Sequence, residues 1–252
     1  MRAGGPKVNS DLGAATRGNE TVDVILFISM PWTGKPALLN ALGGALGADA
    51  VGWVGRTVTR EEIRKGLPRR NLRVLCGQID LALAERLRNV SLVATLIPAP
   101  HTIPVAEYAS ARDRPRHKHH AIANTLFLEE VLQEGHVFAD DLVNVVTRRL
   151  TPPGAAPSVD AALAALSGRP SLVGLSAHPG AFAEAFSRAL GLPKGAIPAS
   201  LFATPSRPDP RGETARVLAT ANAMDRALHD AVRARLGERS RVWRCDAAAP
   251  AR

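Results

Sequence analysis

The strongest constraint on the fold is a nearly unbroken run of β-branched and apolar residues over 22–30, Val-Asp-Val-Ile-Leu-Phe-Ile-Ser-Met. Such a run is typical of a strand that is buried on both faces of a parallel sheet. The segment Pro-Trp-Thr-Gly-Lys-Pro at 31–36 interrupts the run, and apolar residues at helical spacing follow over 37–46. A strand, a tight loop and a helix in succession point backbone N–H groups at an anion. This part of the chain therefore predicts an α/β fold with a candidate anion-binding loop.

The same alternation of strands and helices continues along the chain. Buried strands are predicted over 73–77, 90–97 and 171–175, and helices over 81–87, 125–133, 140–150, 158–166, 180–190 and 214–236. We expect Thr125 to cap its helix, and Pro98, Pro100 and Pro104 to follow the 90–97 strand in a loop. The alternation predicts one α/β domain with a parallel sheet flanked by helices. We place this domain at 21–238, between a disordered leader at 1–20 and a C-terminal tail at 239–252.

Charge and composition narrow the classes of partner. The chain has 32 Lys and Arg against 23 Asp and Glu, a net charge of +9, which favours acidic partners but also fits arginine spread over a solvated surface. Nucleic-acid binding further needs aromatic stacking platforms or a reading helix, and with aromatic residues at 4% we expect no nucleic-acid partner. Cys76 and Cys245 form no disulfide framework, and the 24–30 run is too short to span a bilayer. We expect a cytoplasmic protein that binds no membrane.

Six segments in order carry a resemblance to a known family. Phe27 to Leu38 reads F-I-S-M-P-W-T-G-K-P-A-L, Gly77-Gln78 follows the next strand, and Leu96 to Val105 follows the third. The other three segments lie at 144–150, 172–182 and 222–229. Together they resemble the bacterial sulfotransferases related to carbohydrate sulfotransferases, whose donor is 3'-phosphoadenosine 5'-phosphosulfate. The resemblance implies a P-loop-like sulfotransferase fold over about 22–237, and an Ala-, Arg-, Gly- and Pro-rich composition fits a GC-rich bacterial genome.

The resemblance implies that the loop after the first strand holds the donor phosphate. The family's lysine at the leaving group falls on Trp32, which supplies no charge, and Lys35 brings a cation back three residues later. Thr33, Gly34 and Lys35 are therefore the candidate cofactor-binding residues. The alternative interpretation is a relic turn with a surface lysine.

The catalytic base and the 3'-phosphate site are also altered relative to the family. The family's histidine falls on Gln78, whose amide is not a base, whereas Asp80 points to the same side if the segment is extended. The family's arginine and serine for the 3'-phosphate fall on Ile97 and Val105, which offer no charge-assisted hydrogen bond. His101, in the Pro-rich turn, is another candidate base. The alternative for Asp80 and His101 is an exposed residue with no catalytic role.

The catalytic candidates are thus Lys35, Asp80 and His101, and a small-molecule cleft is expected to be lined by Trp32, Gln78, Ile97, Val105 and Tyr108. An aromatic and apolar wall suits a hydrophobic substrate. The histidines of 112–120 match no metal site, so we expect no metal. We expect Asn144 and Arg148 to hold helices together rather than contact a ligand.

Three functions remain open from the sequence. The first, which we favour, is an enzyme of bacterial specialised metabolism that kept the fold and changed its cofactor or chemistry. The second is a working sulfotransferase that uses Lys35 with Asp80 or His101. The third is a non-catalytic protein that binds a ligand or a protein partner, and a homo-oligomer remains open for each of them.

Overall fold

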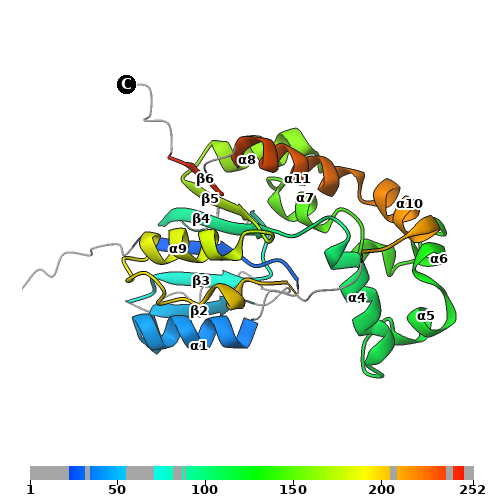
Figure 1. Cartoon of the computed structure of the whole chain (residues 1–252), viewed down its shortest axis with the longest axis horizontal. Coiled ribbons are helices and arrows are strands. Elements are labelled where there is room, and N and C mark those ends of the chain that lie inside the picture. Colours follow the sequence, from blue (N-terminus) through cyan, green and yellow to red (C-terminus); the bar gives the residue numbers. More distant parts are fainter. Residues whose placement is uncertain are drawn as a thin grey trace, which may run out of the picture.

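The computed structural model describes residues 23–31, 35–54, 71–81, 87, 89–204, 209–236 and 241–246, with the side chains of residues 35 and 36 excepted. Its centre is a six-stranded sheet in the order β2-β3-β1-β4-β5-β6 (Figure 1). Five strands are parallel to their neighbours and β6 pairs antiparallel with β5, so the expected α/β fold with a mostly parallel sheet is confirmed. The strands are β1 (Val24–Ile28), β2 (Val51–Val54), β3 (Val74–Gly77), β4 (Val90–Ile97), β5 (Ser171–Leu175) and β6 (Val242–Cys245).

Helices cover both faces of the sheet (Figure 1). One face carries α1 (Lys35–Leu46) and α9 (Pro179–Ala189), and the other carries α7 (Val145–Leu150), α8 (Val159–Ser167) and α11 (Ala223–Leu236). Side chains of β1 alternate between the two cores, Leu26 and Ile28 on the α11 side and Ile25 and Phe27 on the α9 side. Because both faces are covered, the strand reads as an uninterrupted apolar run.

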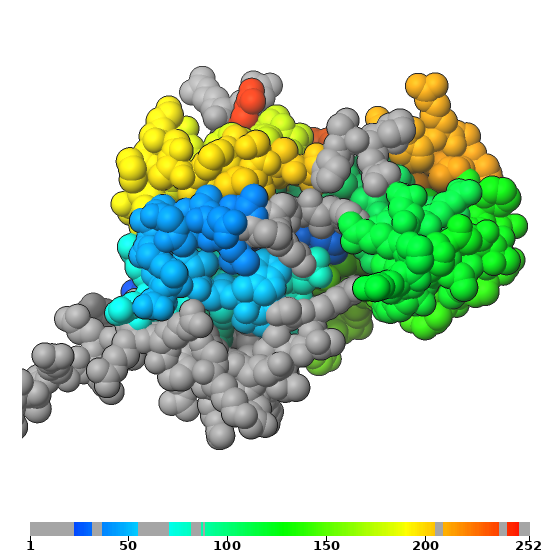
Figure 2. Space-filling model, turned by 90° about the horizontal axis from the view of Figure 1, so that it is seen from below, coloured from blue at the N-terminus to red at the C-terminus, as the bar shows by residue number. Residues whose placement is uncertain are grey.

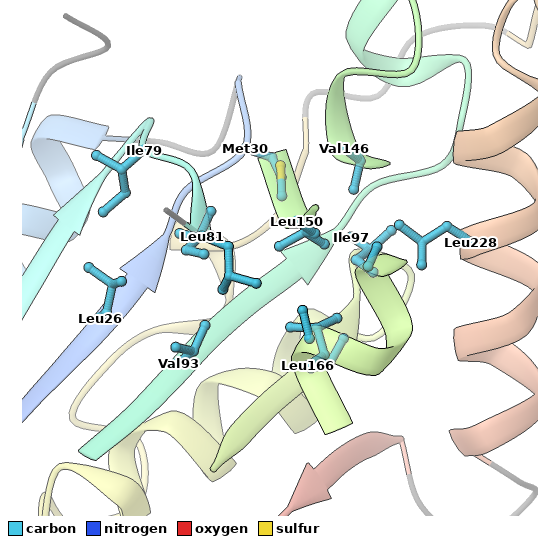
Figure 3. Packing of buried hydrophobic residues seen from close by; sticks show 14 of the residues in the cluster. Leu26, Met30, Ile79, Leu81, Val93, Ile97, Val146, Leu150, Leu166 and Leu228 are labelled. Carbon is cyan, nitrogen blue, oxygen red and sulfur yellow. The ribbon is translucent and has the colours of Figure 1, made fainter. Parts of the chain in front are cut away.

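Four phenylalanines form the centre of the core on the α9 side. Phe27 of β1 contacts Phe182, Phe186 and Phe202, with ring centroids 6.1, 5.4 and 5.8 Å apart, and all four rings are fully buried. A Cβ at Gly174 would lie 2.7 Å from the ring of Phe182, so β5 has a glycine where this helix approaches the strand. The core on the opposite face is aliphatic (Figure 3).

A helical lobe extends past the carboxyl ends of the strands (Figure 1). It consists of α4 (Thr102–Asp113), α5 (His120–Thr125), α6 (Leu128–Gln133) and α10 (Gly212–Ala221). Its own small core contains Ala111, Ala123, Leu128, Val131, Phe138, Leu142 and Leu218. In Figure 2 the green part of this lobe stands beside the blue and cyan layer of α1 and the neighbouring strands.

Helix α4 lies where we expected a Pro-rich loop. Pro104 is the third residue of α4, and a proline is tolerated there because the first N–H groups of a helix have no acceptor within the helix. Pro98 and Pro100 lie in the turn before α4. Three prolines close together therefore ended the strand as expected, but they did not prevent a helix.

Three expected helices have different boundaries. The 125–133 segment is divided, because Thr125 ends α5 and donates to the Ala121 carbonyl (2.9 Å), and α6 begins after Phe127. Within 140–150 only α7 is an α-helix, preceded by the short 3-10 helix Ala139–Asp141. The 214–236 segment breaks at Asn222, between α10 and α11. The helix expected at 81–87 and the leader at 1–20 lie mostly or wholly outside the described residues.

Part of the segment that we expected to be a C-terminal tail pairs with the sheet. Strand β6 lies within the expected tail and pairs with β5 from Ser171↔Cys245 to Gly174↔Val242. Arg235 of α11 also lies over the Trp243 ring, 5.5 Å from its centroid. Residues 242–245 therefore belong to the domain. Among the described helices, none has the length and apolar character that crossing a membrane requires.

Candidate functional site

The topology of the sheet indicates where a ligand would bind. From β1 the chain crosses to β2 on one side of the sheet, whereas from β4 it continues to β5 on the other side. The strands on either side of this reversal, β1 and β4, are neighbours. In open parallel sheets, ligands bind outside the carboxyl ends of the strands at such a switch point.

A cavity of about 510 Å³ lies at the carboxyl end of β4. The turn between β4 and α4, the segment 209–210, and helices α10 and α11 enclose it. Its volume is within the range of about 300–1,000 Å³ that is usual for small-molecule sites. The lining residues are Ala99, Pro100, His101, Asp209, Pro210, Ala215, Leu218, Ala219, Asn222, Arg226, His229, Asp230 and Arg233.

Helix α11 supplies most of the polar lining. Asn222 precedes it, and Arg226, His229, Asp230 and Arg233 follow at intervals of one, three or four residues, so that they share one face of the helix. On the adjacent face Leu228 and Val232 pack into the core beneath the sheet. The amphipathic pattern of α11 thus anchors the helix on one side and exposes charge to the cavity on the other.

His101 contacts a carboxylate at the wall of the cavity. Its Nε2 lies 3.0 Å from Oδ1 of Asp209, and its backbone carbonyl accepts from Val105 N in the first turn of α4. The imidazole contacts Asp209 and is 32% exposed, and it lines the cavity. A histidine that a carboxylate orients is the arrangement of a general base.

His229 is the second histidine of the cavity, and it is buried. Burial lowers the pKa of His229 from its ordinary value, the Arg233 and His101 side chains lower it further, and Asp230 partly opposes them. The Nδ1 atom of His229 lies 3.6 Å from Oδ1 of Asp230. We conclude that the imidazole of His229 is neutral near pH 7 and can accept a proton or a hydrogen bond.

A buried polar network fixes the junction of α10 and α11 beside the cavity. Asn222 Oδ1 accepts from Asn144 N (2.8 Å), and Asn144 Nδ2 donates to the Ala221 carbonyl (3.1 Å). The expectation that Asn144 holds helices together is confirmed. Arg148 contributes to the same region, because its guanidinium donates to the Asp140 carbonyl.

The loop residues from the sequence prediction cannot be placed. Trp32, Thr33 and Gly34 lie outside the described residues, and for Lys35 only the backbone is described, as the first residue of α1. Gln78 and Asp80 follow β3, with Gln78 half-buried and Asp80 exposed. Neither of them lines the cavity.

The apolar residues that we assigned to one cleft do not lie together. Ile97 is 1% exposed and faces Leu228 in the core (Figure 3). Val105 and Tyr108 pack in the helical lobe, where the Tyr108 hydroxyl lies 2.8 Å from the Leu126 carbonyl oxygen. The error follows from the unexpected helix α4, which turns Val105 and Tyr108 toward α5.

Sequence reasoning did not identify Asp209, Arg226, His229 and Arg233 as site residues. The signal for three of them was present, because Arg226, His229 and Arg233 recur at helical spacing opposite apolar positions. Asp209 could not be found in this way, since only the fold brings the 209–210 segment to His101.

The basic 112–120 stretch is partly ordered by ion pairs. His119 is buried, and its Nε2 lies 3.0 Å from Oδ2 of Asp141, while His117 Nε2 lies 3.3 Å from Oε1 of Glu107. These pairs attach the turn after α4 to its surroundings. In the part of the chain that the structure describes, no three His, Cys, Asp or Glu residues are grouped as metal ligands would be.

A second cavity, of about 390 Å³, lies between α9 and β6. Leu92 and Leu172, near the beginnings of β4 and β5, form part of its wall. It therefore lies toward the amino ends of the parallel strands, away from the switch point. None of the residues singled out in the sequence lines it.

Comparison of the sequence with models of known protein families and with curated proteins gives no match.

Proposed function

We propose that this protein is an enzyme that converts a small molecule in the cavity enclosed by the β4–α4 turn, α10 and α11, with His101 as the residue that transfers a proton. The observation that carries the proposal is the 3.0 Å contact between His101 Nε2 and Asp209 Oδ1 at the cavity wall. A base that is oriented by a carboxylate and open to a cavity combines the two features that proton transfer to a bound molecule requires.

The placement of the other candidates favours His101. Asp80 is exposed and lines neither of the two cavities described above. His101 lines the larger cavity together with the neutral imidazole of His229. Two titratable groups whose surroundings differ are the usual basis of acid and base roles within one site.

The substrate in this proposal is a small molecule with an apolar part. Pro100, Pro210 and Leu218, with three alanines, supply the apolar surface of the cavity. This surface replaces the wall that we expected from Ile97 and Val105. A role in bacterial specialised metabolism belongs to the same proposal and is supported by composition and by the six-segment resemblance.

A sulfotransferase-like origin with an altered donor is also part of the proposal. The position that corresponds to the family's phosphate-binding arginine is Ile97, whose side chain is buried in the core. A phosphate beside such a side chain would lose hydration without gaining a hydrogen bond. This supports a change of donor or of chemistry over sulfuryl transfer from 3'-phosphoadenosine 5'-phosphosulfate.

The test is conversion of a small molecule that depends on His101. Purified protein is incubated with a bacterial small-molecule extract, and changes in composition are followed by mass spectrometry. We expect at least one conversion that His101→Gln slows by about 10²–10⁴-fold. His136→Gln is the matched control, because His136 pairs with Glu134 at 3.0 Å and lies outside the cavity.

Some results would contradict the proposal and favour another function. No conversion by either protein would favour a non-catalytic binding protein. Equal conversion by the wild type and His101→Gln would show an enzyme in which His101 does not transfer the proton. Tight calorimetric binding of adenosine 3',5'-diphosphate that is lost in Lys35→Ala would favour a working sulfotransferase.

A further inference from the structure

The polar lining of the cavity enclosed by the β4–α4 turn, α10 and α11 consists of two arginines, two histidines and an asparagine beside two carboxylates. Each of its carboxylates has a basic neighbour, Asp209 with His101 at 3.0 Å and Asp230 with Arg233 at 3.7 Å. Its amide oxygen, Asn222 Oδ1, accepts from Asn144 N. A ligand that completed this lining would have to contribute acceptors.

Arg226 is an exposed arginine of α11 that lines the cavity. Within the described part of the chain its guanidinium forms no ion pair or hydrogen bond, although it lines the cavity. Arg233, two turns further along α11, is held by Asp230. A guanidinium with five N–H groups and no protein acceptor suits a planar or tetrahedral oxyanion.

Asn222 provides a second and independent observation. It is 1% exposed and lines the same cavity, and its Nδ2 has no hydrogen-bond partner among the described residues. The amide cannot be turned over to remove this defect, because Oδ1 must face Asn144 N. A buried donor without a partner costs about 1–3 kcal/mol and often marks the place of a ligand or a water molecule. Asn222 is one helical turn before Arg226.

We propose that this cavity binds a small organic oxyanion, with Arg226 as its charged partner, Asn222 beside it, and Pro100 and Leu218 against its apolar part. The ligand belongs to the class of small carboxylic acids or sulfate esters. Neither Phe, Tyr nor Trp is among the described lining residues, so the cavity offers no large aromatic ring for a nucleotide base. This inference deepens the proposed function by naming its substrate class, but binding can be measured without turnover.

The test is calorimetric titration of the full chain at low ionic strength with hexanoate, hexyl sulfate, hexanamide and inorganic sulfate. We expect saturable binding of hexanoate and hexyl sulfate, and binding of hexanamide weaker by at least about tenfold, since it lacks the charge that a guanidinium recognises. Inorganic sulfate should bind more weakly than hexyl sulfate, because it has no apolar part.

The variants assign the binding to Arg226. Arg226→Gln should weaken hexanoate binding by at least about tenfold, the loss expected for one charge-assisted hydrogen bond. Arg188→Gln on α9 is the matched control and should bind as the wild type does, because Arg188 lies outside this cavity and pairs with Glu184. Circular dichroism confirms that both variants are folded.

Three results would overturn the inference: no binding of either organic anion, equal binding of hexanamide, or unchanged binding by Arg226→Gln. Failure of the oxyanion-binding inference can be distinguished from failure of the proposed function. His101→Gln should lose turnover but keep hexanoate binding, because Arg226 is the charged partner of the anion. Turnover that depends on His101 without any oxyanion binding would leave the proposed function intact and overturn only the substrate class.

Discussion

Asn144 caps α11, the helix that contains Asp225, and Asp225 in turn caps α7, the helix that follows Asn144. Asn144 precedes α7 with φ at 47°, and its Oδ1 accepts from Met224 N (3.1 Å) and Asp225 N (3.2 Å) at the beginning of α11. The Asp225 carboxylate accepts in return from Val146 N (3.1 Å) and Thr147 N (2.7 Å) at the beginning of α7. Four backbone donors that have no acceptor within their own helices are thereby satisfied.

Removing the carboxylate from this exchange should destabilise the fold. Asp225→Ala leaves two backbone N–H groups and the Thr147 hydroxyl buried without an acceptor, which we expect to lower the free energy of unfolding by about 3 kcal/mol. Urea unfolding followed by circular dichroism measures the change. Asp113→Ala, at an exposed residue that ends α4, should change the free energy by less than about 0.5 kcal/mol. Equal losses in the two variants would contradict the capping role.

The phenylalanine cluster predicts a second contrast in stability. Phe27→Ala removes a fully buried ring that contacts three others and should cost about 3–5 kcal/mol, through lost burial and the cavity left behind. Phe127→Ala removes a ring that is 68% exposed and should cost less than about 0.5 kcal/mol. Chemical unfolding of both variants tests the pair, and a large loss in Phe127→Ala would reveal a contact beyond this chain's own core.

Most of the sheet could be predicted from the sequence, because each central strand corresponds to a short run of mostly apolar residues. The runs at 90–97 and 171–175 have the same bounds as β4 and β5, since strands covered on both faces consist almost wholly of apolar residues. Strands β2 and β6 were missed for the opposite reason, because each has only four residues and is mostly half-buried. Val242–Cys245 is only partly buried, contains Arg244, and is stabilised by pairing with β5 rather than by its own pattern.

The site could be predicted only in part. His101 was identified as a candidate base from its place in the Pro-rich turn, which can be read from the sequence alone. Its partner Asp209 lies more than a hundred residues away, and the contact depends on how α10 returns to the turn after β4. The structure separates the residues of the expected Ile97–Val105–Tyr108 wall, because Ile97 ends β4 and is buried in the core beneath the sheet, whereas Val105 and Tyr108 lie on α4 and pack in the helical lobe.

Two glycines in α1 and β3 should respond to alanine in opposite directions. A Cβ at Gly77 would overlap the Val54 carbonyl oxygen on the neighbouring strand, so Gly77→Ala must separate β2 from β3 and should cost about 2 kcal/mol or more. Nothing lies within 4 Å of a Cβ at Gly44, which is in the interior of α1, so Gly44→Ala should add about 0.5–1 kcal/mol. Thermal unfolding of the two variants distinguishes crowding between strands from the ordinary preference of a helix for alanine.

The lowered pKa of His229 predicts how stability depends on pH. In the unfolded chain the imidazole has its ordinary pKa of 6.5, whereas in the folded protein burial, Arg233 and His101 lower the pKa and Asp230 only partly offsets them. Between the two values the unfolded chain binds more protons, so the free energy of unfolding must fall as the pH falls through 6.5. The loss should level off once the pH is below the pKa of the folded state.

This dependence is measured by urea unfolding at intervals between pH 8 and pH 5 on the wild type and on His229→Gln. The stability of the wild type relative to His229→Gln should decrease as the pH falls below 6.5, because glutamine does not titrate. His136→Gln is the control for the loss of an imidazole, since His136 is partly exposed and lies outside the cavity. A profile that is identical for the wild type and His229→Gln would mean that His229 titrates alike in the folded and unfolded chains.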